Sequence, residues 1–213
     1  MINDLGFGNP TKEYLLFLRS ETYLDSLLSE LKNYEPSKND SEETQQELKV
    51  IIEACDNLYL DPQARDRYQE YDEKFEEYIV KVLSQKVPKQ DIEDIVMQIH
   101  DDITPLLLKL KYHYERIRPK QLALHFNMPL YPYTSKSSDT PSYPSGHTFQ
   151  AKVYCEVLGN RYPQYYNSLK RLSEDIAVSR VYMGVHYPSD IEFAKYCADV
   201  VLNHPDFKEK YRI

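Results

Sequence analysis

The chain lacks any long run of apolar residues. None of its windows approaches the roughly 18 consecutive apolar residues that a membrane-spanning helix needs. The first ten residues, MINDLGFGNP, contain neither the basic flank nor the apolar core of a secretory signal. We therefore expect a soluble, cytoplasmic protein without a transmembrane segment.

Cysteine and glycine are also scarce. The three cysteines, Cys55, Cys155 and Cys197, are odd in number and far apart, which fits neither a disulfide framework nor a zinc knuckle. We expect buried free thiols in a reducing compartment. Only five glycines are present, and one of them, Gly146, directly precedes a segment of helical character. Its position there needs an explanation.

Acidic residues outnumber basic ones, and the excess of acidic residues lies in the first half of the chain. The net charge is −8, which argues against general nucleic-acid binding. Residues 1–110 hold 12 Lys and Arg against 24 Asp and Glu, whereas residues 111–213 hold 14 against 10. An anionic small molecule is therefore expected to bind to the second half.

Apolar residues recur at helical spacing along most of the chain, and no stretch alternates as a strand would. The pattern predicts an all-α protein with a single domain over residues 1–213, made of an N-terminal helical layer (1–100) and a core (101–213). The expected helices are one from Asn9 to residue 31, one capped by Asp40, one over residues 68–82, two separated at Pro105, a short piece at 121–126, and three over residues 146–158, 163–181 and 189–203. A long ordered loop of functional importance is expected before Pro144.

Two cationic residues precede that loop. Lys111 and Arg118 are seven residues apart, so on one helix ended by Pro119 they would face the same side. A compact ammonium charge and a planar guanidinium at that spacing suit a tetrahedral oxyanion.

Two further segments follow the loop. A helix that opens at Ser145 and Gly146 would present backbone amides without intrahelical acceptors to an anion, which glycine lets approach closely. In SRVYMGVHYPSD, Arg180 can bind the same anion. Asp190 can accept from one nitrogen of His186 and leave the other free to attack.

The ordered triple of motifs is more specific than any one of them. Lys-x6-Arg-Pro, Pro-Ser-Gly-His and Ser-Arg-x5-His-x3-Asp follow one another over residues 111–190. This arrangement resembles the type 2 phosphatidic acid phosphatase superfamily, which also holds the class A acid phosphatases, glucose-6-phosphatase and the vanadium haloperoxidases. Within it, YPSGHT and GVHYPSD are most similar to the soluble acid phosphatases.

The resemblance implies a fold of helices and a role for each motif residue. The phosphoryl oxygens would be held by Lys111, Arg118, Ser145, Gly146 and Arg180. His186 would be the nucleophile, Asp190 would orient it, and His147 would be the general acid. A small phosphomonoester would be hydrolysed through phosphohistidine with no metal and no cofactor, and vanadate would inhibit. Because His186 must be neutral and His147 protonated, the rate would be bell-shaped in pH.

Three other functions stay open at this point. The same residues would hold vanadate in a vanadium-dependent haloperoxidase, for which the chain is short. A lipid phosphate phosphatase is typically a multi-spanning protein, and no span is expected here. A non-catalytic anion-binding module would have no chemical need for His147, His186 and Asp190.

Several residues lie outside the motifs. Tyr143, next to the glycine segment, is a candidate substrate contact. The remaining histidines, His100, His113, His125 and His204, have no such companions, and we expect them to be structural or to lie on the surface. The wide apolar stripes of the acidic N-terminal half suggest a surface between copies of the chain, a hypothesis of a homo-oligomer.

Overall fold

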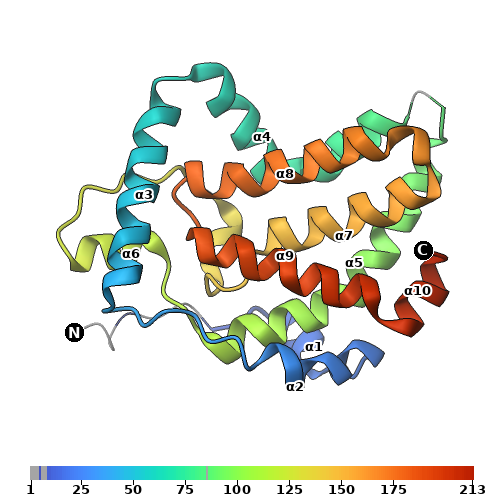
Figure 1. Ribbon diagram of the computed structural model, residues 1–213, viewed down its shortest axis with the longest axis horizontal. Coiled ribbons are helices and arrows are strands. Elements are labelled where there is room, and N and C mark those ends of the chain that lie inside the picture. The colour runs from blue at the N-terminus through green and yellow to red at the C-terminus, as the bar shows by residue number, and fades with distance from the viewer. Residues whose placement is uncertain (1–4, 6–8, 85) are drawn as a thin grey trace.

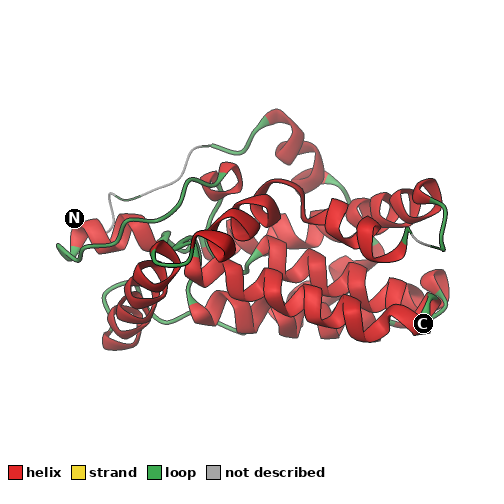
Figure 2. Ribbon diagram, turned by 90° about the horizontal axis from the view of Figure 1, so that it is seen from above, coloured by secondary structure: helices red, strands yellow, loops and turns green. Residues whose placement is uncertain are grey.

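Helices dominate the computed structural model, which describes residue 5 and residues 9–84 and 86–213 (Figures 1 and 2). These described residues contain no β-strand, so the prediction of an all-α fold is confirmed. The α-helices are α1 (Lys12–Arg19), α2 (Leu28–Leu31), α3 (Glu42–Tyr59), α4 (Pro62–Leu83), α5 (Lys89–Tyr114), α6 (Pro119–His125), α7 (Gly146–Arg161), α8 (Tyr166–Tyr182), α9 (Pro188–Asn203) and α10 (Pro205–Tyr211). Short 3₁₀ helices lie at Tyr23–Leu27, Lys136–Asp139 and Pro163–Tyr165.

Three antiparallel helices form the centre of the molecule. Figure 1 shows α7 between α8 and α9, and α7 also contacts α4 and α5. Because the chain reverses after α7 and again after α8, the start of α7, the end of α8 and the start of α9 lie at one end of the bundle. One buried apolar cluster extends from Leu24 to Phe207 and includes side chains of α4, α5, α7, α8 and α9. The connectivity therefore brings the second and third motifs together.

The later helices follow the sequence pattern closely. The predictions of helices at 146–158, 163–181 and 189–203 correspond to α7, α8 and α9, and the short piece near residue 121 corresponds to α6. The segment after α6 is a loop with one 3₁₀ turn, as expected. The sequence did not predict α10.

The first helix is shorter than predicted. Thr11, rather than Asn9, caps α1, and the chain leaves the helix at Ser20, which has extended backbone. Lys109 of α5 donates to the Ser20 carbonyl (2.6 Å) and to the Asp25 carboxylate (2.7 Å), which fixes the break. The segments on both sides of the break pack on α5. The pattern of apolar residues therefore continues across the break, and the sequence gives no sign that the helix ends there.

A second difference is the cap of α3. Ser41, not Asp40, caps this helix, and its Oγ accepts the Thr44 amide at 3.2 Å. Asp and Ser are both good helix caps, and α3 begins directly after Ser41, the second of the two residues.

The prediction of two helices separated at Pro105 is wrong, because α5 is continuous through this residue. Proline removes one intrahelical hydrogen bond, to the carbonyl of Asp101. Asp101 is exposed, so water can bond that carbonyl. Thr104 does not cap a second helix; its Oγ1 donates to the His100 carbonyl at 2.6 Å.

Lys111 and Arg118 do not share a helix either, in contrast to the prediction. Glu115 ends α5 with a left-handed conformation (φ 48°). Arg118 is the cap of the next helix, with Pro119 at its first position, because a residue before proline is disfavoured in helical conformation. The two cations therefore converge through a turn between α5 and α6.

Candidate active site

The motif residues gather around one cavity at the end of the bundle. Its volume is about 270 Å³. The lining residues are Glu13, Tyr14, Phe17, His100, Thr104, Leu107, Leu108, Lys111, Arg118, Thr140, Gly146, His147, Gln150 and His186. Five of the residues predicted from the motifs are thus brought together: Lys111, Arg118, Gly146, His147 and His186.

The N-terminus of α7 forms one wall of this cavity. The first amides of a helix have no intrahelical acceptor and carry the positive end of its dipole. A Cβ atom built on Gly146 would lie 3.5 Å from Leu107 Cδ2 and 3.7 Å from Lys111 Cε. These are ordinary contacts, so packing does not demand glycine here. The missing side chain instead keeps space open between the helix start and the Lys111 side chain.

Two buried cations, Lys111 and Arg118, also line the cavity. Lys111 Nζ donates to the Pro141 carbonyl at 2.7 Å, and Arg118 donates to the carbonyls of Thr140 and Val185, each at 2.8 Å. Burial, and next the charge of Arg118, hold the pKa of Lys111 well below its usual value. A bound dianion would oppose both effects and stabilise the ammonium form.

His186 lies in the turn between α8 and α9, with its two nitrogens in different surroundings. Its Nδ1 lies 3.0 Å from Asp190 Oδ2, and its Nε2 lies 3.0 Å from Arg118 Nη1. Since a carboxylate accepts, Nδ1 carries the proton and Nε2 presents a lone pair toward the cations. Burial, followed by Arg118, holds the pKa of His186 well below its usual value. The imidazole is therefore neutral, as a nucleophile requires.

Asp190 is surrounded by donors. Oδ2 also accepts from the Tyr187 amide (2.9 Å) and from the Ser142 hydroxyl, and Oδ1 accepts from Arg116 Nη1 at 2.6 Å. Burial alone would raise the pKa of Asp190, but Arg116 and the hydrogen bond from His186 outweigh it and lower the pKa. The carboxylate is therefore ionised and fixed in orientation.

Arg116 connects this carboxylate to α3. Its Nη2 lies 2.9 Å from Glu47 Oε2, and its Nη1 donates to Ser189 Oγ at 2.7 Å. Glu47 Oε1 accepts the Ser189 amide at 2.7 Å, at the N-terminus of α9. The guanidinium also lies over the Tyr187 ring, 4.0 Å from its centroid. The acidic N-terminal half thus supports the residue that orients His186.

Arg180 is held by a second acidic residue of that half. Its Nη2 lies 2.7 Å from Asp72 Oδ1, which also accepts from Ser135 Oγ at 2.7 Å. His147 Nε2 donates to the Asp72 main-chain carbonyl at 3.1 Å. Burial and then Arg180 lower the pKa of His147, while Asp72 acts in the opposite direction. Asp72 therefore contacts both a predicted phosphate ligand and the predicted acid.

Four of the predicted residues do not line the cavity: Asp190 and Arg180, which are described above, and Ser145 and Tyr143. Ser145 is fully buried; its Oγ pairs with Thr148 Oγ1 at 3.0 Å and its amide donates to the Asp190 carbonyl at 3.1 Å. Tyr143 stacks on Phe193 with ring centroids 4.4 Å apart, and its hydroxyl donates to the Tyr34 carbonyl at 3.0 Å. Ser145 links α7 to α9, and Tyr143 packs in the core.

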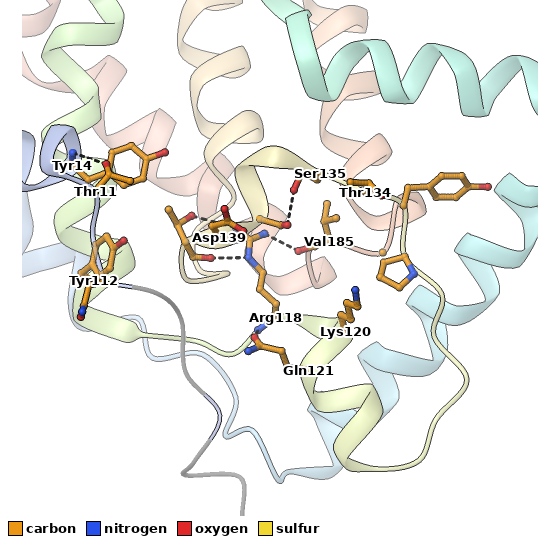
Figure 3. A pocket seen from close by; sticks show the side chains of 16 residues that line it. Thr11, Tyr14, Tyr112, Arg118, Lys120, Gln121, Thr134, Ser135, Asp139 and Val185 are labelled. Atoms are coloured by element: carbon orange, nitrogen blue, oxygen red, sulfur yellow. Dashed lines mark hydrogen bonds between the residues drawn. The ribbon is translucent and has the colours of Figure 1, made fainter.

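A larger cavity of about 580 Å³ lies beside the first. Figure 3 shows Arg118 in its middle, with Lys120 and Thr134 on one side and Tyr14 and Tyr112 on the other. The two cavities share Tyr14, Arg118 and Thr140, but His147 lines only the smaller one.

Four supporting residues were missed by the sequence analysis: Glu47, Asp72, Arg116 and Ser142. For two of them a signal was present. Asp72 follows Tyr68 by four residues and precedes Phe75 by three, so it lies on the apolar stripe of α4, and Glu47 lies four residues before Ile51 on that of α3. A carboxylate on an apolar stripe needs a buried partner, which points to a buried cation.

Comparisons with known proteins support the family resemblance. Residues 96–198, which include every motif residue, match the model of the PAP2 superfamily. The fold is similar to the crystal structure of the first transmembrane PAP2 type phosphatidylglycerolphosphate phosphatase from Bacillus subtilis, with a TM-score of 0.52 and 18% identity over 93% of this chain and 95% of that chain. At this identity the likeness concerns the fold alone.

No curated protein matches the chain. Within the described part of this chain, no helix is long and apolar enough to cross a membrane. The resemblance to the type 2 phosphatidic acid phosphatases is confirmed by the match of residues 96–198 to the PAP2 superfamily model.

Proposed function

We propose that this protein is a phosphatase that hydrolyses small phosphomonoesters through a phosphohistidine intermediate, without a metal ion. The observation that carries the proposal is the pair of contacts on His186, with Asp190 at Nδ1 and Arg118 at Nε2. The family match supports phosphatase chemistry.

In the first step, His186 Nε2 attacks phosphorus and the ester oxygen leaves. The contact between Nε2 and Arg118 Nη1 has to open, so that the guanidinium passes to a phosphoryl oxygen. Lys111, Arg118 and the first amides of α7 stabilise the equatorial oxygens, a task for which other phosphoryl-transfer sites use metal ions. His147 donates its proton to the leaving oxygen. Burial and Arg180 lower the pKa of His147 to about 3 in the free protein, and the negative charge of the bound phosphoryl group raises it again.

In the second step, water attacks the phosphorus of phosphohistidine and the imidazole leaves. His147, now neutral, accepts the proton from this water. Asp190 keeps its hydrogen bond to Nδ1 throughout and stabilises the positive charge that His186 carries as phosphohistidine. This proton transfer restores the protonated form of His147, and inorganic phosphate is released.

The size of the cavity supports a compact substrate. Its volume of about 270 Å³ is at the lower end of small-molecule sites. Two acyl chains of a phospholipid would not fit inside it. The substrate of the structural relative, a phosphatidylglycerolphosphate phosphatase, is therefore not carried over to this chain.

The test is hydrolysis of ethyl phosphate between pH 4 and 8 with EDTA present. We expect turnover that orthovanadate inhibits and that His186→Ala reduces on the order of 10⁴-fold or more. Labelled substrate should leave acid-labile phosphate on the wild-type chain and none on the variant.

His113→Ala is the matched control, since His113 is exposed on the last turn of α5 and lies outside the cavity. It should retain full activity. Turnover that requires a metal ion, or that survives in His186→Ala, would rule out the phosphohistidine mechanism.

A further inference from the structure

The catalytic cavity extends well beyond the phosphoryl site. Its lining residues on α5 are His100, Thr104, Leu107, Leu108 and Lys111, a spacing that places them on one face of the helix. The rise of an α-helix separates His100 from Lys111 by about 16 Å along the axis. The cavity is therefore elongated, with the phosphoryl site at one end and His100 at the other.

The chemistry decides on which side of the phosphoryl site the alcohol lies. The leaving oxygen has to lie beside His147, which is its proton donor in the proposed reaction. His147 lines the elongated cavity but not the larger one of Figure 3. One turn further along α7 the same cavity is lined by Gln150. The alcohol therefore extends from His147 toward Gln150 and His100.

The middle of this path is apolar. Leu107 and Leu108 line it on α5, and Tyr14 and Phe17 line it on α1. The Phe17 ring meets the His100 ring edge to face, with centroids 6.4 Å apart. Short α1 is thus a wall of the cavity, although none of its residues is fully buried.

The far end is polar, and its hydrogen bonds are directional. Tyr154 Oη lies 3.1 Å from His100 Nδ1, and Gln150 Nε2 lies 3.4 Å from the same atom. Two donors that converge on Nδ1 make it an acceptor, so the ring proton is on Nε2. Burial lowers the pKa of His100, which keeps the ring neutral. His100 lines the end of the cavity, so Nε2–H is the donor that this ring can offer to a bound molecule.

Building on the proposed phosphatase activity, we infer that Phe17 and His100 select the leaving group. The alcohol that fits is compact, apolar next to the ester oxygen, and carries a hydrogen-bond acceptor at its far end for His100 Nε2–H. His100, which the sequence analysis assigned to structure or surface, is thus a substrate contact.

Three phosphate esters test this inference: ethyl, hexyl and 6-hydroxyhexyl phosphate. The last two have leaving oxygens of nearly equal basicity and differ only at the far end. We expect wild-type kcat/KM to be about fivefold higher for the hydroxyhexyl ester than for the hexyl ester, the size of one hydrogen bond. His100→Ala should abolish this preference and His100→Gln, which keeps a donor, should restore part of it.

Phe17→Ala tests the apolar wall. It should lower kcat/KM for both six-carbon esters by roughly tenfold, and leave ethyl phosphate, which is too short to reach it, unchanged. Leu16→Ala is the matched control, since Leu16 is the neighbouring residue on α1 and is 72% exposed; it should affect none of the esters. Unchanged ethyl phosphate hydrolysis also shows that each variant is folded.

The outcomes separate this inference from the proposed function. Hydrolysis of ethyl phosphate with equal rates for the two six-carbon esters would overturn the role of His100 alone. A rate that rises further with dodecyl phosphate would also overturn it, because a long chain has to pass His100. No hydrolysis of any ester would overturn the proposed function and this inference with it.

Discussion

Asp72 affects the proposed chemistry mainly through its charge on His147. This carboxylate raises the pKa of the imidazole, while burial and Arg180 lower it. Asp72→Asn removes the raising effect, so the pKa of His147 falls further and less of it is protonated at a given pH. The high-pH limb of kcat, which reports the acid in the enzyme–substrate complex, should move to lower pH by about 1 unit.

The pH profile of kcat for ethyl phosphate measures this shift. Glu73→Gln removes the same charge from the next, exposed residue of α4 and should leave the limb in place. A limb that stays unmoved in Asp72→Asn would mean that another group is the acid.

Substitution of Gly146 should affect thermal stability and anion binding differently. Because a Cβ here meets only ordinary contacts at 3.5 and 3.7 Å, Gly146→Ala should fold with an unchanged or slightly higher melting temperature. The added methyl group points into the space between the helix start and Lys111, where a phosphoryl oxygen would lie. We therefore expect inhibition constants for phosphate and vanadate to rise tenfold or more, on the order of 1–2 kcal/mol.

Thermal unfolding and inhibition titrations give the two readouts for Gly146→Ala. Loss of melting temperature without loss of affinity would show that the glycine serves packing instead of anion binding.

At the residue scale, the sequence yields candidates for the reactive side chains but does not show what holds them. Residue identity and order suffice to propose His186, His147 and Asp190, because the motifs are short. Arg116, Glu47 and Asp72 reach the site from other elements, and a single sequence does not show which buried cation an acidic residue on a helix stripe will meet. Tyr143 is the opposite case: it is close in sequence to Gly146, but its side chain does not line the cavity.

The turn between α8 and α9 is the element that positions His186. Gly184 has φ 74°, and a Cβ there would lie 2.8 Å from both Cys55 Sγ and Pro132 Cβ. Gly184→Ala combines backbone strain with a collision, so we expect a loss of about 1–3 kcal/mol in the free energy of unfolding. Because His186 is two residues away, kcat should fall as well.

Chemical denaturation and ethyl phosphate kinetics check Gly184→Ala. Gly159→Ala is a useful comparison, because the nearest contacts of its Cβ would all be with Tyr166, the closest to ring atom Cδ2 at 2.6 Å, and Gly159 is distant in sequence from His186. Gly159→Ala should lower the free energy of unfolding, whereas kcat per folded molecule should equal that of the wild type. Equal loss of kcat in both variants would contradict a specific role of the turn.

At the element scale, helical periodicity predicted most helices but placed several ends wrongly. The pattern could not show that α5 passes through Pro105, since the compensating exposure of Asp101 is a tertiary property. It also placed Arg118 on the wrong helix, because the left-handed turn at Glu115 has no glycine to mark it. The two cations nevertheless meet, as the motif implied, by a route that spacing alone did not predict.

At the scale of the whole molecule, the segment that matches the PAP2 superfamily does not include everything that the fold uses. Residues 96–198 contain all the motif residues, but α4 contributes the buried side chains Tyr68, Tyr71, Phe75, Ile79 and Leu83 to the common core. Each is worth about 1.5–3 kcal/mol of burial, and a domain is stable by about 5–15 kcal/mol in total. Glu47 and Asp72, moreover, hold Arg116 and Arg180 from outside the matched segment.

A fragment of residues 89–213 should therefore not fold on its own. It should show no cooperative thermal transition by circular dichroism and no hydrolysis of ethyl phosphate, although every motif residue is present. Expressed together with residues 1–88, it should recover both, because the cut lies in the connection before α5 and leaves each helix intact. An active, cooperatively melting 89–213 fragment would show that α3 and α4 are dispensable, and that the contacts of Glu47 and Asp72 do not govern the site.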